Sequence, residues 1–353
     1  MTKRIFGDKL RTLGFEKPSV RVIVNNKCPL KCEFCPTAGD AGELISGRNP
    51  ISLEVQKEVI QQLVEKGYYY WSLTGGEPTS FPKETKEIIY FLDDIIPNNQ
   101  ESSIKINTNG IGLNEEFLNG LEGKISLIKI SIDSLKTPTG RLDIRNNFKN
   151  RDLAERILNN VDLTSKKGFP IRIHSVFEKA NIDEFSKLFN YFVLEKGFNW
   201  KAYETSYFRT NLGEFDYSKW KEEIFVSLEP IIDDFTKKYG EPKLIFSTGK
   251  NGSPMSAFEI PTTHKNNPIV RFRNISVGSH YSGFSCDNCS EKYCHEGIVN
   301  LFIHPSGGFT TCRLPGKFHP FSNPNGIFNQ KLFDKSLFEI ENEVFAKKYF
   351  HKN

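Results

Sequence analysis

The chain has 353 residues, of which 38% are hydrophobic and 13% aromatic, so it is long enough for one large α/β domain and a smaller additional one. Its 47 basic and 43 acidic residues leave a net charge of +4, and this bias is too small to favour a nucleic-acid-binding protein. No apolar stretch approaches the roughly 18 residues of a membrane span, and the charged N-terminal segment lacks the apolar part of a secretory signal, so we expect a cytoplasmic protein without membrane contact.

The first two hundred residues alternate between short apolar runs and amphipathic segments. The apolar runs predict six strands, at residues 20–24, 68–73, 104–107, 125–131, 171–176 and 198–203. Helices are expected between them, and the first has Ser52 as a potential N-cap and Gly67 just beyond its end. We find no polar alternation in the strands, which is typical of a parallel sheet covered by helices. The pattern therefore predicts an α/β fold with right-handed crossovers.

Three cysteines follow the first predicted strand. Cys28, Cys32 and Cys35 have the spacing C-x3-C-x2-C, which can bind three irons of a [4Fe–4S] cluster and leave the fourth iron without a protein ligand. The alternatives are a structural zinc site and a disulfide. Zinc usually takes four ligands, and no fourth thiol or close histidine lies near Cys35. A reducing cytosol disfavours the disulfide.

Residues 28–35 resemble the cluster motif of the radical S-adenosylmethionine (SAM) superfamily. The resemblance implies that SAM binds the open iron and that electron transfer cleaves it to a 5′-deoxyadenosyl radical, which takes a hydrogen atom from the substrate. It also implies that Phe34 lies beside the adenine, and that the fold is a partial (β/α)6 barrel. A further implied partner is an electron donor such as flavodoxin or ferredoxin.

The loop after the second predicted strand contains Gly75, Gly76 and Glu77 in the sequence Thr-Gly-Gly-Glu-Pro. Loops at the carboxyl ends of parallel barrel strands are where such folds keep their chemistry, and paired glycines let the backbone approach a ligand closely. This loop resembles the superfamily's GGEP motif, which contacts the SAM amino group. The alternative is an ordinary turn.

Two more polar segments follow the third and fourth predicted strands. Asn107 and Asn109 belong to an Asn-Thr-Asn-Gly segment, which resembles the family's T-N-G segment near the SAM ribose and carboxylate. Ser131 begins a Ser-Ile-Asp segment that resembles the family's S-x-D segment. Either segment could instead be a turn in which the side chains cap the backbone.

Four cysteines form a second group near the C-terminus, namely Cys286, Cys289, Cys294 and Cys312. A predicted hairpin over residues 298–311 can bring Cys312 back toward the other three. The spacing alone is compatible with a zinc site or with a second iron–sulfur cluster. A resemblance to the two-cluster family typified by MoaA, which cyclises GTP in molybdenum-cofactor synthesis, implies a second [4Fe–4S] cluster that orients the substrate or accepts an electron.

Four side chains on the predicted strands are candidate catalytic or substrate-binding groups. Arg21 stands where the two-cluster family has an arginine directed at the substrate's anionic end, and Arg172 where it has a lysine. His174 and Glu204 lie at the ends of the fifth and sixth strands and could assist proton transfer or bind substrate, although structural roles are equally compatible with their positions.

The chain also departs from the family's GTP-cyclising members. These carry a lysine and an arginine on the second strand, where this sequence has Tyr70 and Ser72. We therefore expect a different small polar substrate, such as a nucleotide, a sugar or a biosynthetic intermediate.

We expect three regions: a radical SAM barrel over residues 1–206, a connecting region over 207–275 and an auxiliary-cluster domain over 276–353. Residues 247–267 are rich in Gly, Ser, Pro, Thr and Asn, which predicts a loop or linker. The alternative functions are a peptide-modifying radical SAM enzyme and a non-catalytic iron–sulfur or zinc regulator. The GGEP-like and T-N-G-like segments disfavour the regulator, because it would not need a SAM pocket.

Overall fold

The structure is a computed structural model that describes residues 17–30, 32, 47–135, 150–205, 217–246, 254–273, 300–310 and 318–346. Its centre is a set of six neighbouring parallel strands. They are β1 (Ser19–Ile23), β2 (Tyr70–Thr74), β3 (Ser103–Thr108), β4 (Leu127–Ser131), β5 (Ile171–Phe177) and β6 (Asn199–Glu204). The predicted α/β fold with parallel strands is confirmed.

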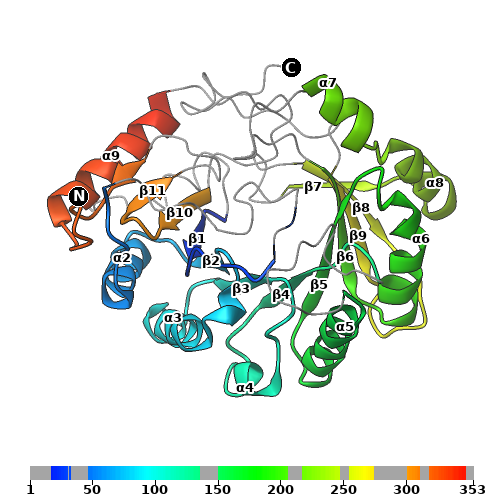
Figure 1. Ribbon diagram of the computed structural model, residues 1–353, viewed down its shortest axis with the longest axis horizontal. Coiled ribbons are helices and arrows are strands. Elements are labelled where there is room, and N and C mark those ends of the chain that lie inside the picture. The colour runs from blue at the N-terminus through cyan, green and yellow to red at the C-terminus, as the bar shows by residue number, and fades with distance from the viewer. Residues whose placement is uncertain are drawn as a thin grey trace.

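Helices cover the outer face of this strand arc, as Figure 1 shows. They are α2 (Leu53–Glu65), α3 (Pro82–Ile95), α4 (Glu115–Leu118), α5 (Asn150–Lys166) and α6 (Phe185–Leu188), which continues as the π-helix Phe189–Glu195. Ser52 caps α2 as expected, because its hydroxyl accepts a hydrogen bond from the Val55 N–H at 3.3 Å. Each helix lies between consecutive parallel strands, as crossover connections require.

The sheet continues on both sides of the six-stranded arc. Beyond β6 lie β9 (Ile269–Arg273), which is parallel to it, and then the antiparallel strands β8 (Pro254–Glu259) and β7 (Lys243–Phe246). Beyond β1 lie the parallel strand β10 (Asn300–His304) and the antiparallel strands β11 (Gly308–Thr310) and β12 (His319–Pro320). The helices α8 (Glu229–Tyr239) and α9 (Gln330–Ala346) accompany these two extensions.

These extensions correct one sequence expectation. Strand β8 lies within residues 247–267, where the composition predicted a loop or linker. Pairing with β9 from Ser256 to Glu259 supplies backbone hydrogen bonds that local composition does not reveal. The three proposed region boundaries stay a prediction, but strands from all three regions belong to one sheet.

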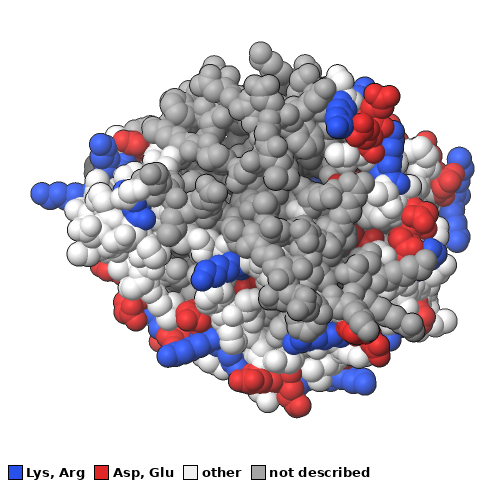
Figure 2. All heavy atoms as spheres, in the orientation of Figure 1, with Lys and Arg blue, Asp and Glu red and all other residues white. Residues whose placement is uncertain are grey.

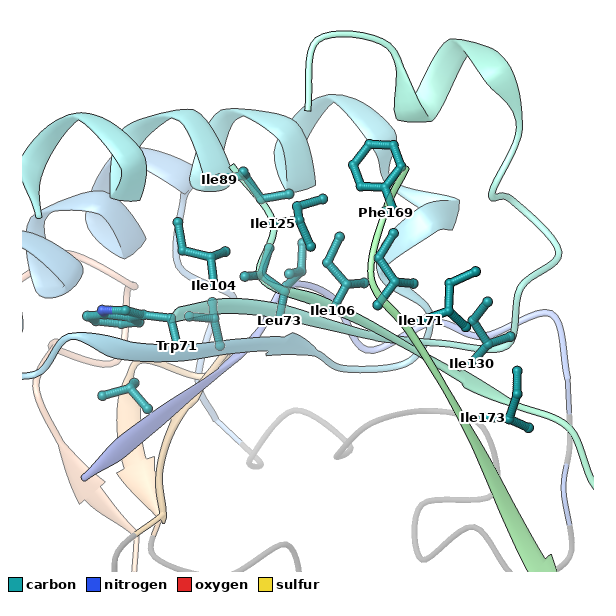
Figure 3. Packing of buried hydrophobic residues seen from close by; sticks show 14 of the residues in the cluster. Trp71, Leu73, Ile89, Ile104, Ile106, Ile125, Ile130, Phe169, Ile171 and Ile173 are labelled. Carbon is teal, nitrogen blue, oxygen red and sulfur yellow. The ribbon is translucent and has the colours of Figure 1, made fainter. Parts of the chain in front are cut away.

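The hydrophobic core lies between the strand arc and its helices. Figure 3 shows Leu73, Ile106 and Ile130 directed toward the helix layer that includes Ile89. Along β1 and β5 every second residue is buried, and the residues between them are only half-buried. The strands therefore alternate, contrary to our sequence interpretation, and their second face forms the polar concave side of the arc.

The described helices include none that is long and apolar enough to cross a membrane.

Candidate functional site

The loop after β2 lies directly against the loop that contains the first cysteines. Gly76 N–H donates to the Asn25 carbonyl at 2.9 Å, and Glu77 N–H donates to the Lys27 carbonyl at 2.8 Å. A Cβ at Gly76 would lie 1.9 Å from the Lys27 carbonyl oxygen, and Gly75 has a φ of 140°. Glycine is therefore required at both positions for this close backbone approach.

The buried carboxylate of Glu77 joins the loops after β2 and β3. Its Oε1 accepts hydrogen bonds from the Thr79 N–H at 2.9 Å and from the Thr79 and Thr108 hydroxyls, each at 2.7 Å. Its Oε2 accepts from the Asn109 N–H at 2.7 Å. Burial raises the pKa of Glu77, and these hydrogen bonds oppose the rise, that from Asn109 most strongly.

Asn25 connects the loop that contains Cys28 to Glu77. Its side-chain Nδ2 donates to the Glu77 carbonyl at 3.0 Å, and its Oδ1 accepts from the Lys27 N–H at 2.8 Å. Asn109 approaches the loop from the other side, with its Nδ2 3.8 Å from Cys28 Sγ. The structure thus brings together the three motifs at residues 25–28, 75–77 and 107–109, which lie far apart in sequence.

The structure describes some of the other expected cofactor residues and leaves others outside its described ranges. Cys32 is half-buried beside the core, as Cys28 is. Asn107 faces the concave side and its Nδ2 donates to Ser72 Oγ at 2.9 Å, while Ser131 stands beside His174 in the register of β4 and β5. Six residues lie outside the described residues, and their assignments stay predictions: Phe34, Cys35, Cys286, Cys289, Cys294 and Cys312.

The concave side of the arc carries many positive charges. The basic side chains stand on six strands, β1, β3, β4, β5, β6 and β9. They are Arg21, Lys105, Lys129, Arg172, Lys201, Arg271 and Arg273. No aspartate or glutamate stands at a concave-facing position of β1–β6 or β9. On the outer surface in Figure 2, by contrast, basic and acidic side chains are interspersed.

Burial among like charges alters the titration of these groups. Desolvation, reinforced by the charge of Arg172, lowers the pKa of Lys105 to about 8. Desolvation also lowers the pKa of Lys201 well below its usual value, and Arg273 and Arg172 lower it further. Arg271 has its pKa lowered to about 10 by burial and by Arg172. The concave side is thus an electropositive environment without a facing acidic side chain on those strands.

His174 lies in the middle of this environment. Its Nδ1 is 3.2 Å from the Tyr203 hydroxyl, and its buried Nε2 has no hydrogen-bond partner among the residues that the structure describes. Burial lowers the pKa of His174 well below its usual value, and the charge of Lys201 acts in the same direction. The imidazole is therefore neutral at physiological pH, and its Nε2 is available to a bound molecule.

The two remaining candidates lie apart from this histidine. Arg21 on β1 has its guanidinium 5.0 Å from the centre of the Phe302 ring. Glu204 alternates with the concave-facing residues of β6, and its carboxylate accepts from the Leu228 N–H at 2.7 Å, just before α8. The structure thus joins Glu204 to the start of α8 and does not bring it to His174.

Sequence analysis missed most of the concave-facing cations. Lys105, Lys129 and Lys201 each occupy an alternate position between apolar residues, and Arg271 and Arg273 do so in the segment Ile-Val-Arg-Phe-Arg. That period of two was the signal that could have identified them, because alternate residues of a strand share one face.

We predict that Glu77→Gln destabilises the protein. An amide has one acceptor oxygen where the carboxylate has two, so a buried N–H or hydroxyl loses its partner, at a cost of about 2–4 kcal/mol. Chemical denaturation of the full chain measures this loss. The matched control is Glu116→Gln, on the exposed face of α4, and equal unfolding midpoints for the two variants would contradict the role of Glu77.

We predict that Lys105→Met stabilises the ligand-free protein at pH 7. The lowered pKa, about 8 instead of 10.5, corresponds to a cost on the order of 3 kcal/mol for the buried charge. This cost is fully present below pH 8 and disappears between about pH 8 and 10.5, because there the unfolded chain binds the proton and the folded chain does not. Unfolding measured against pH should show a gain that shrinks above pH 8, whereas the exposed control Lys83→Met should show none.

The comparisons with known proteins agree with this arrangement. The sequence profile of the Radical SAM superfamily matches residues 22–192. A S-adenosylmethionine-dependent nucleotide dehydratase from Flammeovirga pacifica is 28% identical over 172 residues, which cover 47% of this chain and 56% of that protein. A GTP 3′,8-cyclase from Synechocystis sp. is 24% identical over 236 residues, with 66% and 64% covered. The chain therefore spans between half and two thirds of the length of these relatives.

A solved structure shows the same fold over nearly the whole chain. Streptococcus suis SuiB, bound to S-adenosylmethionine, superposes with a TM-score of 0.59 and 14% identity, and the match covers 98% of this chain and 71% of SuiB. The superfamily profile spans the strands and loops that carry Cys28, Glu77 and Asn109. Residues 22–192 of the chain therefore belong to the radical SAM superfamily, whose members use a [4Fe–4S] cluster and SAM.

Proposed function

We propose that this enzyme abstracts a hydrogen atom from a small, negatively charged substrate that binds on the concave side of the strand arc. The supporting observation is the row of cations on β3, β4, β5, β6 and β9, which begins beside the loops that carry the SAM motifs. A buried group of like charges favours an anionic ligand. The relatives named for GTP and for a nucleotide support the same class of small anionic substrate.

We assign Cys28, Cys32 and Cys35 to the SAM-cleaving cluster. Cys28 and Cys32, the two described thiols, lie in the loop held by Gly75, Gly76 and Glu77, and this arrangement fits a cluster with SAM beside it. When bound, the cluster and SAM supply the electron and the 5′-deoxyadenosyl radical. The role of Asn109 is to orient this centre from the β3 loop, since its amide reaches the Cys28 sulfur.

The chain's own residues bind and orient the substrate. Arg172 and Lys201 hold its anionic part, and the neutral His174 offers Nε2 to a polar group of the substrate. The Tyr203 hydroxyl fixes the imidazole orientation through Nδ1. The sheet and helix layers exclude water from one side of this region, which strengthens each charge interaction.

The second cysteine group completes the proposal. We assign Cys286, Cys289, Cys294 and Cys312 to a second [4Fe–4S] cluster, on the basis of their MoaA-like placement in the sequence. A soluble one-electron carrier such as flavodoxin or ferredoxin is the proposed reductant. A peptide substrate is less compatible with the proposal, because no feature of a peptide backbone requires so many buried cations.

We predict that the variant Cys28→Ala/Cys32→Ala/Cys35→Ala no longer cleaves SAM. The three thiolates bind the irons, so their loss removes the reducing centre. The measurement is reductant-dependent formation of 5′-deoxyadenosine by anaerobically reconstituted protein. The control is Cys286→Ala/Cys289→Ala, which should keep substrate-independent cleavage measurable. Continued formation of 5′-deoxyadenosine by the first variant would refute the assignment.

We predict that the same triple variant retains about four irons per chain, because the second cysteine group binds its own cluster. Iron and zinc analysis of the reconstituted variant tests this directly. One zinc per chain with no iron would show a structural zinc site instead. Cys294→Ala in that background should change the iron content or the spectrum if Cys294 is the fourth ligand, and leave both unchanged if only three thiols bind.

A further inference from the structure

We propose that Asn160 of α5 is a positioning residue for the SAM site, which acts by fixing the loop after β3 so that Asn109 faces Cys28. The proposal rests on the proposed function, because it concerns the same centre. It goes further by giving a part in SAM binding to a helix residue outside the three motifs at residues 25–28, 75–77 and 107–109.

The side chain of Asn160 crosses from α5 to the loop after β3. Its Nδ2 donates to the Gly110 carbonyl at 2.9 Å and to the Ile111 carbonyl at 3.0 Å. A primary amide has two N–H donors, and these two consecutive carbonyls use both. The reverse orientation of the amide would place its oxygen against two carbonyl oxygens, which would repel it. The contact therefore depends on a side chain with two donors.

The loop that Asn160 holds is a close-packed turn. Gly110 has a φ of 82°, and a Cβ there would lie 3.0 Å from the side chains of Ile130 and Ile157. Gly110 N–H also donates to the Thr108 hydroxyl at 3.0 Å. Ile157 and Asn160 are three residues apart and so lie on one face of α5. The same helix face therefore packs against the turn and binds its carbonyls.

The turn sets the orientation of the Asn109 side chain. Ile111 N–H donates to Asn109 Oδ1 at 2.9 Å, which directs Asn109 Nδ2 to Cys28 Sγ, 3.8 Å away. The Asn109 N–H donates to Glu77 Oε2 at 2.7 Å. Asn160 binds the carbonyl of the same Ile111 whose N–H orients Asn109. A displacement of Ile111 would therefore turn the Asn109 amide away from the cysteine loop.

The helix itself does not account for an asparagine at this position. Asn160 lies in the interior of α5 (Asn150–Lys166), and asparagine is a poor helix former because its side chain competes for backbone groups. Leucine has a similar size and a higher helix propensity. The two loop carbonyls, in contrast, require the donors that asparagine supplies.

Leucine substitutions separate the role of the loop from that of the helix. Asn160→Leu removes both donors while it favours the helix, and Asn160→Gln keeps the amide on a longer side chain. The matched control is Asn159→Leu, the same change at the neighbouring, exposed residue of α5. Asn160→Ala and Asn159→Ala replace the leucine pair if Asn160→Leu does not fold, because alanine adds no volume.

Two measurements on the full chain test the proposal. The first is the dissociation constant of SAM, from the change in the electron paramagnetic resonance spectrum of the reduced, anaerobically reconstituted protein. The second is hydrogen exchange over residues 108–113 in the cluster-free protein. For Asn160→Leu we expect about fivefold weaker SAM binding, as loss of one neutral hydrogen bond predicts, and faster exchange. Asn160→Gln should recover part of both, and Asn159→Leu should match the wild type.

A lower unfolding midpoint of Asn160→Leu with unchanged SAM affinity and unchanged exchange would show a purely structural residue and overturn the proposal. Equal SAM affinity and equal exchange for Asn160→Leu and Asn159→Leu would overturn it as well. Formation of 5′-deoxyadenosine by the wild type is measured in the same preparations. Its absence would refute the proposed function, whereas the exchange measurement needs no cofactor and would still decide whether Asn160 fixes the loop.

Discussion

The buried carboxylate of Glu77 is the interaction on which the arrangement of the motif loops depends. It accepts hydrogen bonds from the loop after β2 and from the loop after β3, through Thr79, Thr108 and Asn109. Its backbone carbonyl also accepts from Asn25, in the loop after β1. Three loops that leave neighbouring parallel strands are thus fixed relative to one another. A single buried residue can do this because parallel strands bring their carboxyl ends to one edge of the sheet.

The two faces of the strands have opposite energetic roles. The outer face buries side chains such as Leu73, Ile106 and Ile130 in the core between strands and helices, and this apolar burial stabilises the fold. The concave face carries the cations Lys105 and Lys201, whose pKa values are lowered by burial and by neighbouring positive charges, and this lowering reflects a free-energy cost. The stable outer layer can therefore offset the repulsion within the concave one. Such destabilised groups are expected where a protein binds a ligand.

Sequence patterns predicted the strands and motif loops well, because the information there is local. Ser52 caps its helix as expected, and the motif loops that carry Glu77 and Asn109 follow the second and third strands as expected. The concave cations were missed because short strands such as Leu-Ile-Lys-Ile-Ser look apolar when their alternation is ignored. Strand β8 was missed because its partner β9 is needed to define it. The contact made by Glu204 could not be predicted from the sequence either, because it depends on where the chain before α8 returns to the sheet.

These contacts distinguish the strands that end in the motif loops from the strands that carry the concave-facing cations. Strands β1, β2 and β3 end in the loops that Glu77 joins, whereas β5, β6 and β9 carry Arg172, Lys201 and Arg271 on their concave faces. The motif loops and these three cations therefore lie on different strands of one arc. The first part coincides with motifs of the superfamily, and the second extends into β6 and β9, which both lie outside the matched residues. Because Lys201 and Arg271 lie outside residues 22–192, the superfamily match bears on the loops that Glu77 joins and not on the cations of β6 and β9.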